Sequence, residues 1–134
     1  MKIKAIIIRL ALSFAFLFSG LLIYLATRTG TYVNAMFDSL ISVPAIAPDT
    51  VFNTVIYNWG ADFLWVVSFT LALSCFVEKP IIAAGIVAGL GVMFEFFQLF
   101  GITTGTFDIF DIVAEALAAV LVFVGIMFLD KKNR

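Results

Sequence analysis

Five polar side chains able to bind a ligand or transfer a proton lie within one short stretch of the chain. They are Glu95, Gln98, Asp108, Asp111 and Glu115, and the stretch reads EFFQLFGITTGTFDIFDIVAE. Long apolar runs flank it on both sides. An ionised side chain in the hydrocarbon core of a membrane costs roughly 2.5–3.5 kcal/mol on insertion scales. Each carboxylate in this stretch therefore needs a physical reason.

The spacing of these residues predicts that they meet at one level of a helical bundle. Glu95 and Gln98 are three positions apart and so share a helix face. One face of the next predicted helix carries three acidic residues, spaced three and then four positions apart: Asp108, Asp111 and Glu115. At about 1.5 Å of rise per residue, each glutamate lies about 9 Å from the loop that joins the two helices. We therefore expect the side chains to converge from neighbouring helices.

Asp62, at the start of the preceding apolar run, adds a fifth carboxylate on the same side, where Arg28 is the only cation predicted. Carboxylates that lie close together at low dielectric cannot all stay ionised. Some are therefore protonated, or a cation is bound, or water fills the site. Because hard cations prefer oxygen ligands, we predict Glu95, Asp111 and Glu115 as ligands for Mg²⁺, Mn²⁺ or Ca²⁺. The full set of candidate binding residues is Asp62, Glu95, Gln98, Asp108, Asp111 and Glu115.

Each of these residues also has a structural explanation. Asp62 and Asp108 stand at predicted helix starts, where aspartate is a good N-cap. Asp111 in a first turn would favour the helix dipole, and Gln98 near a helix end would bond a neighbouring backbone group. The two glutamates lie too deep for capping, so their structural alternative is a protonated hydrogen bond between helices.

The composition indicates a membrane protein and excludes several kinds of chemistry. Of the 134 residues, 63% are hydrophobic, whereas about half are apolar in a typical globular domain. The absence of histidine excludes Ser-His triads and His-ligated zinc. A net charge of −1 argues against a nucleic-acid partner. The single cysteine, Cys75, forms no internal disulfide and is expected to serve in packing.

Four apolar segments predict one all-α membrane domain over residues 1–134, an antiparallel bundle of four transmembrane helices. The spans are 6–25, 61–77, 81–100 and 109–129, long enough for a hydrocarbon core of about 30 Å. A cleaved signal peptide is the rival interpretation of the first span. We disfavour it because the apolar run exceeds the usual ~7–15 residues and no A-x-A site follows.

The connection at 26–60 is predicted to be an extracytoplasmic loop with two short amphipathic helices. Apolar residues recur at helical spacing within Val33–Ile41 and again within Val51–Trp59. These pieces would lie on the membrane surface or cover the helix ends as a lid. A plain loop is the alternative.

Lysine and arginine predict the orientation. If both termini lie in the cytoplasm, Arg28 is the only basic residue outside. The other basic residues then lie on the cytoplasmic side: Lys2, Lys4, Arg9, Lys79, Lys131, Lys132 and Arg134. This asymmetry fits the positive-inside rule and predicts a multi-pass membrane protein with both termini in the cytoplasm. The lipid bilayer is thus its first predicted partner. Small residues that allow helices to approach closely are expected at Gly85, Gly89, Gly91 and Ala118.

Two short motifs resemble a known family. The chain carries E-x-x-Q at Glu95–Gln98 and D-x-x-D at Asp108–Asp111. The segment Asn58–Trp65, which precedes both motifs, contains Asp62 at the start of the preceding span. This order resembles the signature of VanZ-like membrane proteins over residues 55–125. The resemblance implies a role in the bacterial cell envelope and a link to low-level resistance to the lipoglycopeptide teicoplanin.

The chain departs from that family pattern at two places. VanZ-like proteins often have an arginine near the position of Gly105 and an asparagine where Glu115 stands. This chain therefore has one positive charge fewer and one carboxylate more, which favours a cation or a proton over an anion.

Three functions remain open from the sequence. The first, which we favour, is a binding or modulatory protein of the envelope that engages a lipid-linked or glycopeptide ligand or a membrane protein. The second is a metal-dependent enzyme acting on lipid-linked phosphates, although the sequence identifies no catalytic residue. The third is a subunit of a proton- or cation-coupled transporter.

Overall fold

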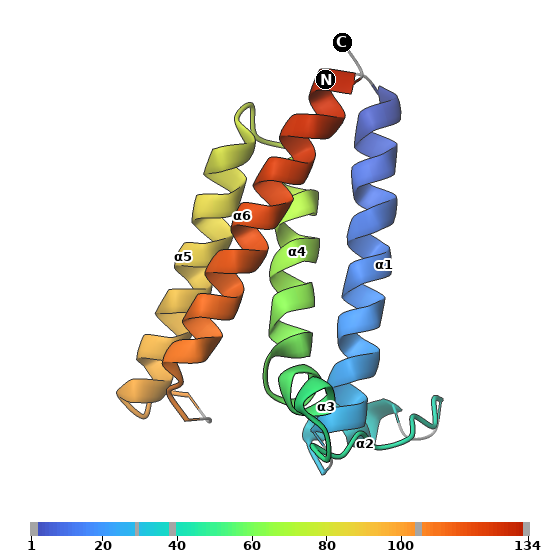
Figure 1. Cartoon of the computed structure of the whole chain (residues 1–134), viewed down its shortest axis with the longest axis vertical. Helices are drawn as coiled ribbons and strands as arrows, with labels where there is room; N and C mark the ends of the chain where they lie inside the picture. Colours follow the sequence, from blue (N-terminus) through green and yellow to red (C-terminus); the bar gives the residue numbers. More distant parts are fainter. Residues whose placement is uncertain (1–2, 29, 38–39, 104–105, 133–134) are drawn as a thin grey trace.

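The computed structural model describes residues 3–28, 30–37, 40–103 and 106–132. Over this part of the chain the structure is helical and contains no strand. The elements are α1 (Ile3–Thr27), α2 (Tyr32–Phe37), α3 (Val51–Val55), the π-helical turn η1 (Ile56–Gly60), α4 (Ala61–Leu73), α5 (Pro80–Leu99) and α6 (Ile109–Lys132). Figure 1 shows the long helices side by side, with α2 and α3 gathered at one end.

Four helical segments are long and apolar enough to cross a membrane. They are Ile3–Thr27, Val51–Leu73, Pro80–Leu99 and Ile109–Lys131. The prediction of an all-helical, multi-pass chain is confirmed at this level. Large apolar side chains such as Phe14, Phe76 and Phe128 are exposed on the outside of the bundle. Their exposure suits lipid rather than water, because apolar surface in water costs about 25 cal/mol per Å².

The second segment differs from the predicted span at 61–77. α3, η1 and α4 form one helix from Val51 to Leu73, and the backbone at Gly60 and Ala61 is α-helical. The predicted separate piece at Val51–Trp59 is therefore the first part of the second long helix. A π-helical turn at this point widens the helix locally, which lets the chain continue without a break.

This helix also ends earlier than predicted, at Leu73. The amide of Cys75 donates to the carbonyl of Ala72 (3.0 Å), and the amide of Phe76 donates to the carbonyl of Leu73 (3.0 Å). Hydrogen bonds between residues three apart tighten the last turn and end the helix. Pro80 then begins α5, where its missing N–H is not needed.

The short helix α2 occupies part of the predicted amphipathic segment, but its polar side faces the protein. Asn34 is buried, and its side-chain amide donates to the carbonyl of Leu25 at the end of α1 (3.1 Å). Met36 and Leu40, which belong to the predicted apolar face, are exposed, so this face does not cover the helix ends. Residues 38 and 39 lie outside the described residues. The hydrogen bonds of Asn34 thus decide which side of α2 contacts α1.

Helix α4 lies at the centre of the bundle. α1 packs along one side of it, and α5 and α6 pack against it and against each other (Figure 1). The buried core consists of small and branched apolar residues: Val66, Val67, Leu71, Ala84, Val87, Ala118, Ala119, Val122 and Ile126. Because alanine and valine dominate, the helix backbones approach closely.

Polar contacts hold α1 in place at the end of the bundle where α1 begins. Arg9 is only 2% exposed; its guanidinium donates to the carbonyl of Ser74 (3.0 Å) and forms an ion pair with Asp130. One level deeper, the hydroxyls of Ser13 and Ser68 each donate to the other's carbonyl (2.9 Å). These contacts bring the first turns of α1 and the last turns of α6 to the same end (Figure 1). Of the basic residues used to predict orientation, Lys2 and Arg134 lie outside the described residues.

Candidate functional site

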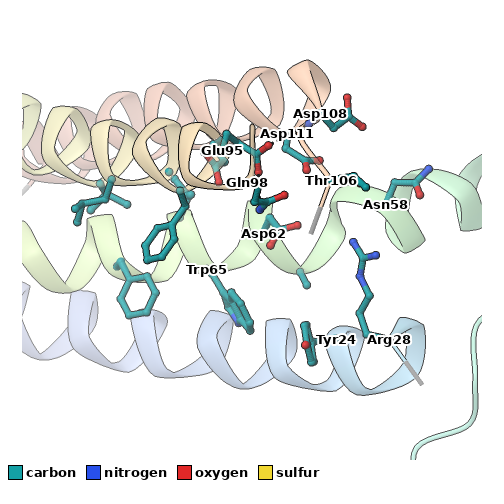
Figure 2. A pocket seen from close by; sticks show the side chains of 18 of the residues that line it. Tyr24, Arg28, Asn58, Asp62, Trp65, Glu95, Gln98, Thr106, Asp108 and Asp111 are labelled. Atoms are coloured by element: carbon teal, nitrogen blue, oxygen red, sulfur yellow. Dashed lines mark hydrogen bonds between the residues drawn. The ribbon is translucent and has the colours of Figure 1, made fainter. Parts of the chain in front are cut away.

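A cavity of about 930 Å³ lies toward the other end of the bundle, between α1, η1, α4, α5 and the start of α6. Every predicted binding residue lines it: Asp62, Glu95, Gln98, Asp108, Asp111 and Glu115. Figure 2 shows the side chains of Asp62, Gln98 and Asp111 pointing toward one another from three helices, with Asp108 near the edge. The spacing argument thus located residues that the tertiary structure brings to one place.

Glu95 joins the end of α5 to the start of α6. It is only 4% exposed. One carboxylate oxygen accepts the backbone N–H of Asp108 (3.1 Å), and the other accepts the side-chain amide of Gln98 (3.3 Å). The carboxylate of Asp108 in turn accepts the N–H of Phe110 (2.9 Å), as an N-cap does. Glu95, Gln98 and Asp108 therefore have a structural role in setting the angle between α5 and α6.

Glu115 is much less well satisfied. Its Oε2 is buried and has no hydrogen-bond partner within the described part of the chain. The carboxylate lies against Gly91 of α5, where an added Cβ would stand 2.5 Å from the Glu115 Cδ. A glycine at position 91 is therefore required for Glu115 to occupy this place between α5 and α6. A buried polar atom without a partner costs about 1–3 kcal/mol, so Glu115 has no evident stabilising role.

The other predicted packing residues differ among themselves. Ala118 is fully buried in the core beside α4 and α5. Gly85 and Gly89 are exposed, and a Cβ at either position would meet no atom of the described residues within 4 Å. Within one copy of the chain, Gly85 and Gly89 therefore do not contact a neighbouring helix as predicted.

Asp62 is not an N-cap, contrary to the structural alternative. The residues before it, Gly60 and Ala61, already have helical backbone angles, because α4 continues from η1. The N–H groups near Asp62 therefore belong to a continuing helix rather than to a free helix start. Capping does not explain why a carboxylate stands here, facing the cavity.

Aromatic side chains form one wall of the cavity. Tyr24 of α1 stacks on Trp65 of α4, with ring centroids 5.5 Å apart. Gly20 makes room for the indole, because a Cβ at that position would lie 2.7 Å from Trp65 Cδ1. Trp65 Nε1 is buried without a hydrogen-bond partner among the described residues. Tyr57 of η1 adds a further ring.

Three lining residues were not predicted from the sequence: Tyr24, Tyr57 and Asn58. Tyr24 lies in the last turn of α1, and the predicted cation Arg28 follows four positions later, just after the helix ends, so both lie on the cavity side (Figure 2). That spacing was a usable signal. Tyr57 and Asn58 reach the cavity from η1, and no sequence pattern announces a π-helical turn.

The predicted metal ligands line the same cavity but do not form a metal site. Within the described ranges, no group of three or more Asp, Glu, His or Cys side chains is placed to hold a metal ion. Both oxygens of Glu95 are engaged in hydrogen bonds, and Glu115 is turned toward Gly91. The set Glu95, Asp111 and Glu115 therefore gains no support as a divalent-cation centre.

No family model, curated protein or solved structure matches this chain. The resemblance to VanZ-like proteins rests on the two short motifs alone, and Gly105, close to the position of their arginine, lies outside the described residues.

Proposed function

We propose that this chain is a small multi-pass protein of the bacterial cytoplasmic membrane that binds a positively charged ligand in the cavity. The four apolar helices support a membrane location. The distribution of lysine and arginine supports an antiparallel arrangement with both termini in the cytoplasm, so that the cavity faces outward. The observation that carries the proposal is the convergence of carboxylates from α4, α5 and α6 on one cavity of about 930 Å³.

The charge balance of the cavity supports a cationic ligand. Five lining residues carry carboxylates, and Arg28 is the one lining cation. Within the described residues, the ion pair within 4 Å is that of Arg9 with Asp130, at the other end of the bundle. Two like charges 4 Å apart repel by about 4 kcal/mol at an effective dielectric constant of 20. A positively charged group in the cavity lowers this repulsion.

Binding is better supported than catalysis. The described residues that line the cavity include no histidine, cysteine or lysine. The carboxylates are not arranged as a metal site, and Glu95 is already engaged by Gln98 and Asp108. We therefore assign no catalytic residue. The resemblance to VanZ-like proteins supports a ligand of the cell envelope and a link to teicoplanin resistance.

The melting temperature of the purified protein in mild detergent tests this proposal. The titrants are ethanolamine, octylamine, Mg²⁺, Mn²⁺ and Ca²⁺. A ligand that binds only the folded state stabilises it by RT ln(1 + [L]/Kd), about 2.7 kcal/mol at one hundred times Kd. We expect at least one amine to raise the melting temperature, and Asp62→Asn to remove that rise.

Glu78→Gln is the matched control, because Glu78 is an exposed carboxylate in the turn between α4 and α5. It should respond to the amine as the wild type does. A rise that is equal in all three proteins, or absent from all, would contradict the proposal. The same variants, expressed in a teicoplanin-susceptible bacterium, test the resistance link: only Asp62→Asn should lose protection.

A further inference from the structure

We infer that the ligand is a phospholipid whose headgroup carries both an ammonium and a phosphate, and that it reaches the cavity sideways, between α1 and α5. This inference rests on the proposed binding function and narrows it to one class of ligand. It depends on the shape of the cavity, on its unpartnered polar atoms and on the position of its single cation.

The route into the cavity that we infer lies between α1 and α5. α1 and α5 both line it, yet they make no extensive contact with each other, because each packs on a different side of α4 (Figure 1). Three lining side chains of α4 and α5 are apolar and about half exposed: Phe69 (52%), Leu90 (47%) and Phe94 (54%). Phe69 lies seven residues beyond Asp62 on α4, about 10 Å further along the helix. The site therefore has a polar end and an apolar end, as an amphiphile does.

The polar end suits an ammonium group. The carboxylates of Asp62 and Asp111 point into the cavity without an ion pair in the described residues. Tyr24, Trp65 and Tyr57 stand close by, and the faces of such rings attract cations. Glu115 also lines the cavity and adds to its negative charge, although its Oε2 is packed against Gly91.

The mouth of the cavity suits a phosphate. The side chain of Arg28 is exposed at the end of α1 and extends toward the cavity (Figure 2). It forms no ion pair within 4 Å among the described residues. A guanidinium binds a phosphate through two parallel hydrogen bonds.

This arrangement distinguishes lipids by the charges of their headgroups. A headgroup with both an ammonium and a phosphate matches both parts of the site. A lipid with a phosphate but no ammonium places a negative charge near five carboxylates and is rejected. A free headgroup without acyl chains leaves the apolar side of the cavity unfilled.

The test is a set of binding titrations on the full-length protein in detergent, followed by melting temperature. The probes are dioctanoyl phosphatidylethanolamine, dioctanoyl phosphatidylglycerol, phosphoethanolamine and octylamine. We expect phosphatidylethanolamine to bind about tenfold more tightly than phosphatidylglycerol, a difference that one well-placed charge contact can produce. Phosphoethanolamine should bind about tenfold more weakly than the lipid, because it buries no chain.

Two variants test the ammonium contact and the phosphate contact separately. Asp62→Asn should weaken phosphatidylethanolamine about fivefold or more and should not weaken phosphatidylglycerol, because the variant removes one of the charges that repel it. Arg28→Gln should weaken phosphatidylethanolamine and leave octylamine unchanged, since octylamine has no phosphate. Asp111→Asn replaces Asp62→Asn if that variant does not fold, and Glu78→Gln is the control that should match the wild type.

Equal affinity for phosphatidylethanolamine and phosphatidylglycerol would overturn the inference. So would phosphoethanolamine binding as tightly as the lipid, which would point to a soluble ligand. If octylamine still binds in an Asp62-dependent manner in either case, the proposed binding function stands without the lipid. If no probe binds in a manner that depends on Asp62 or Asp111, the inference and the proposed function both fail.

Discussion

The two ends of the helical bundle both hold charged side chains among apolar helices, but they satisfy those charges differently. At one end the buried Arg9 has an anion, Asp130, and the carbonyl of Ser74 as partners. At the other end the cavity collects five carboxylates around a single arginine, and Glu115 Oε2 has no partner within the described chain. A charge buried for stability is paired, because an unpaired charge at low dielectric costs several kcal/mol. The difference supports the proposal that the cavity binds a ligand.

Removing the charge of Arg9 should have the largest effect. Arg9→Met leaves Asp130 without its cation and Ser74 without its donor, and we expect a loss of about 3 kcal/mol in the free energy of unfolding. Asp130 is partly exposed, so water offsets part of the loss. Thermal or denaturant unfolding in detergent measures it.

The double variant Arg9→Met with Asp130→Asn should recover part of this stability, because it removes both charges. If Arg9→Met is as stable as the wild type, the paired end does not hold the bundle together, and the contrast between the two ends disappears.

A methyl group at Gly91 should have an intermediate effect. Gly91→Ala places a Cβ against the Glu115 carboxylate and must displace it, so we expect a loss of about 2 kcal/mol, typical of overpacking. Gly89→Ala is the matched control on the same helix, since a Cβ there meets no described atom within 4 Å. It should be neutral or stabilising by up to about 1 kcal/mol, from helix propensity.

Adding Glu115→Ala to Gly91→Ala should restore stability, because the group in the way is removed. Equal destabilisation by Gly91→Ala and Gly89→Ala would contradict the close contact between Gly91 and Glu115.

Neutralising Glu115 should have the smallest effect, and one of opposite sign. Glu115→Gln replaces a half-buried carboxylate, whose Oε2 has no partner among the described residues, with a neutral group of similar size. We therefore expect a gain of about 1 kcal/mol in the free energy of unfolding. The same variant should lose ligand binding. Melting temperatures with and without octylamine measure both effects. A loss of stability as large as that from Arg9→Met would mean that both ends of the bundle use their charges for folding.

Much of the architecture follows from local properties of the chain. Helix number depends on runs of apolar residues, which are read directly from the sequence, and all four long segments appear in the structure. The residues of the cavity were predictable for a related reason, since helical spacing and distance from a loop define their level. The same reasoning predicted a helical piece from Val51 but not its continuation into the second span, because the π-helical turn η1 has no sequence signal.

Pairwise contacts were not predictable in the same way. Arg9 and Asp130 are 121 positions apart, and their pairing depends on the packing of α1 against α4 and of α4 against α6. Gly85, Gly89 and Gly91 look alike in sequence, yet only Gly91 faces another side chain. Which glycine matters depends on the rotation of α5 about its axis, which the packing of the whole bundle determines.

The sequence by itself determined that this protein is helical, apolar enough for a membrane, and acidic at one level near the loop between its last two helices. These properties depend on residue type and on spacing along one helix, both of which are local. Only the tertiary structure decided that Tyr24 and Tyr57 line the same cavity, and that Arg9 is paired whereas Glu115 Oε2 has no partner among the described residues. Those outcomes depend on how helices distant in sequence pack together, because a charged atom is satisfied by its neighbours in space.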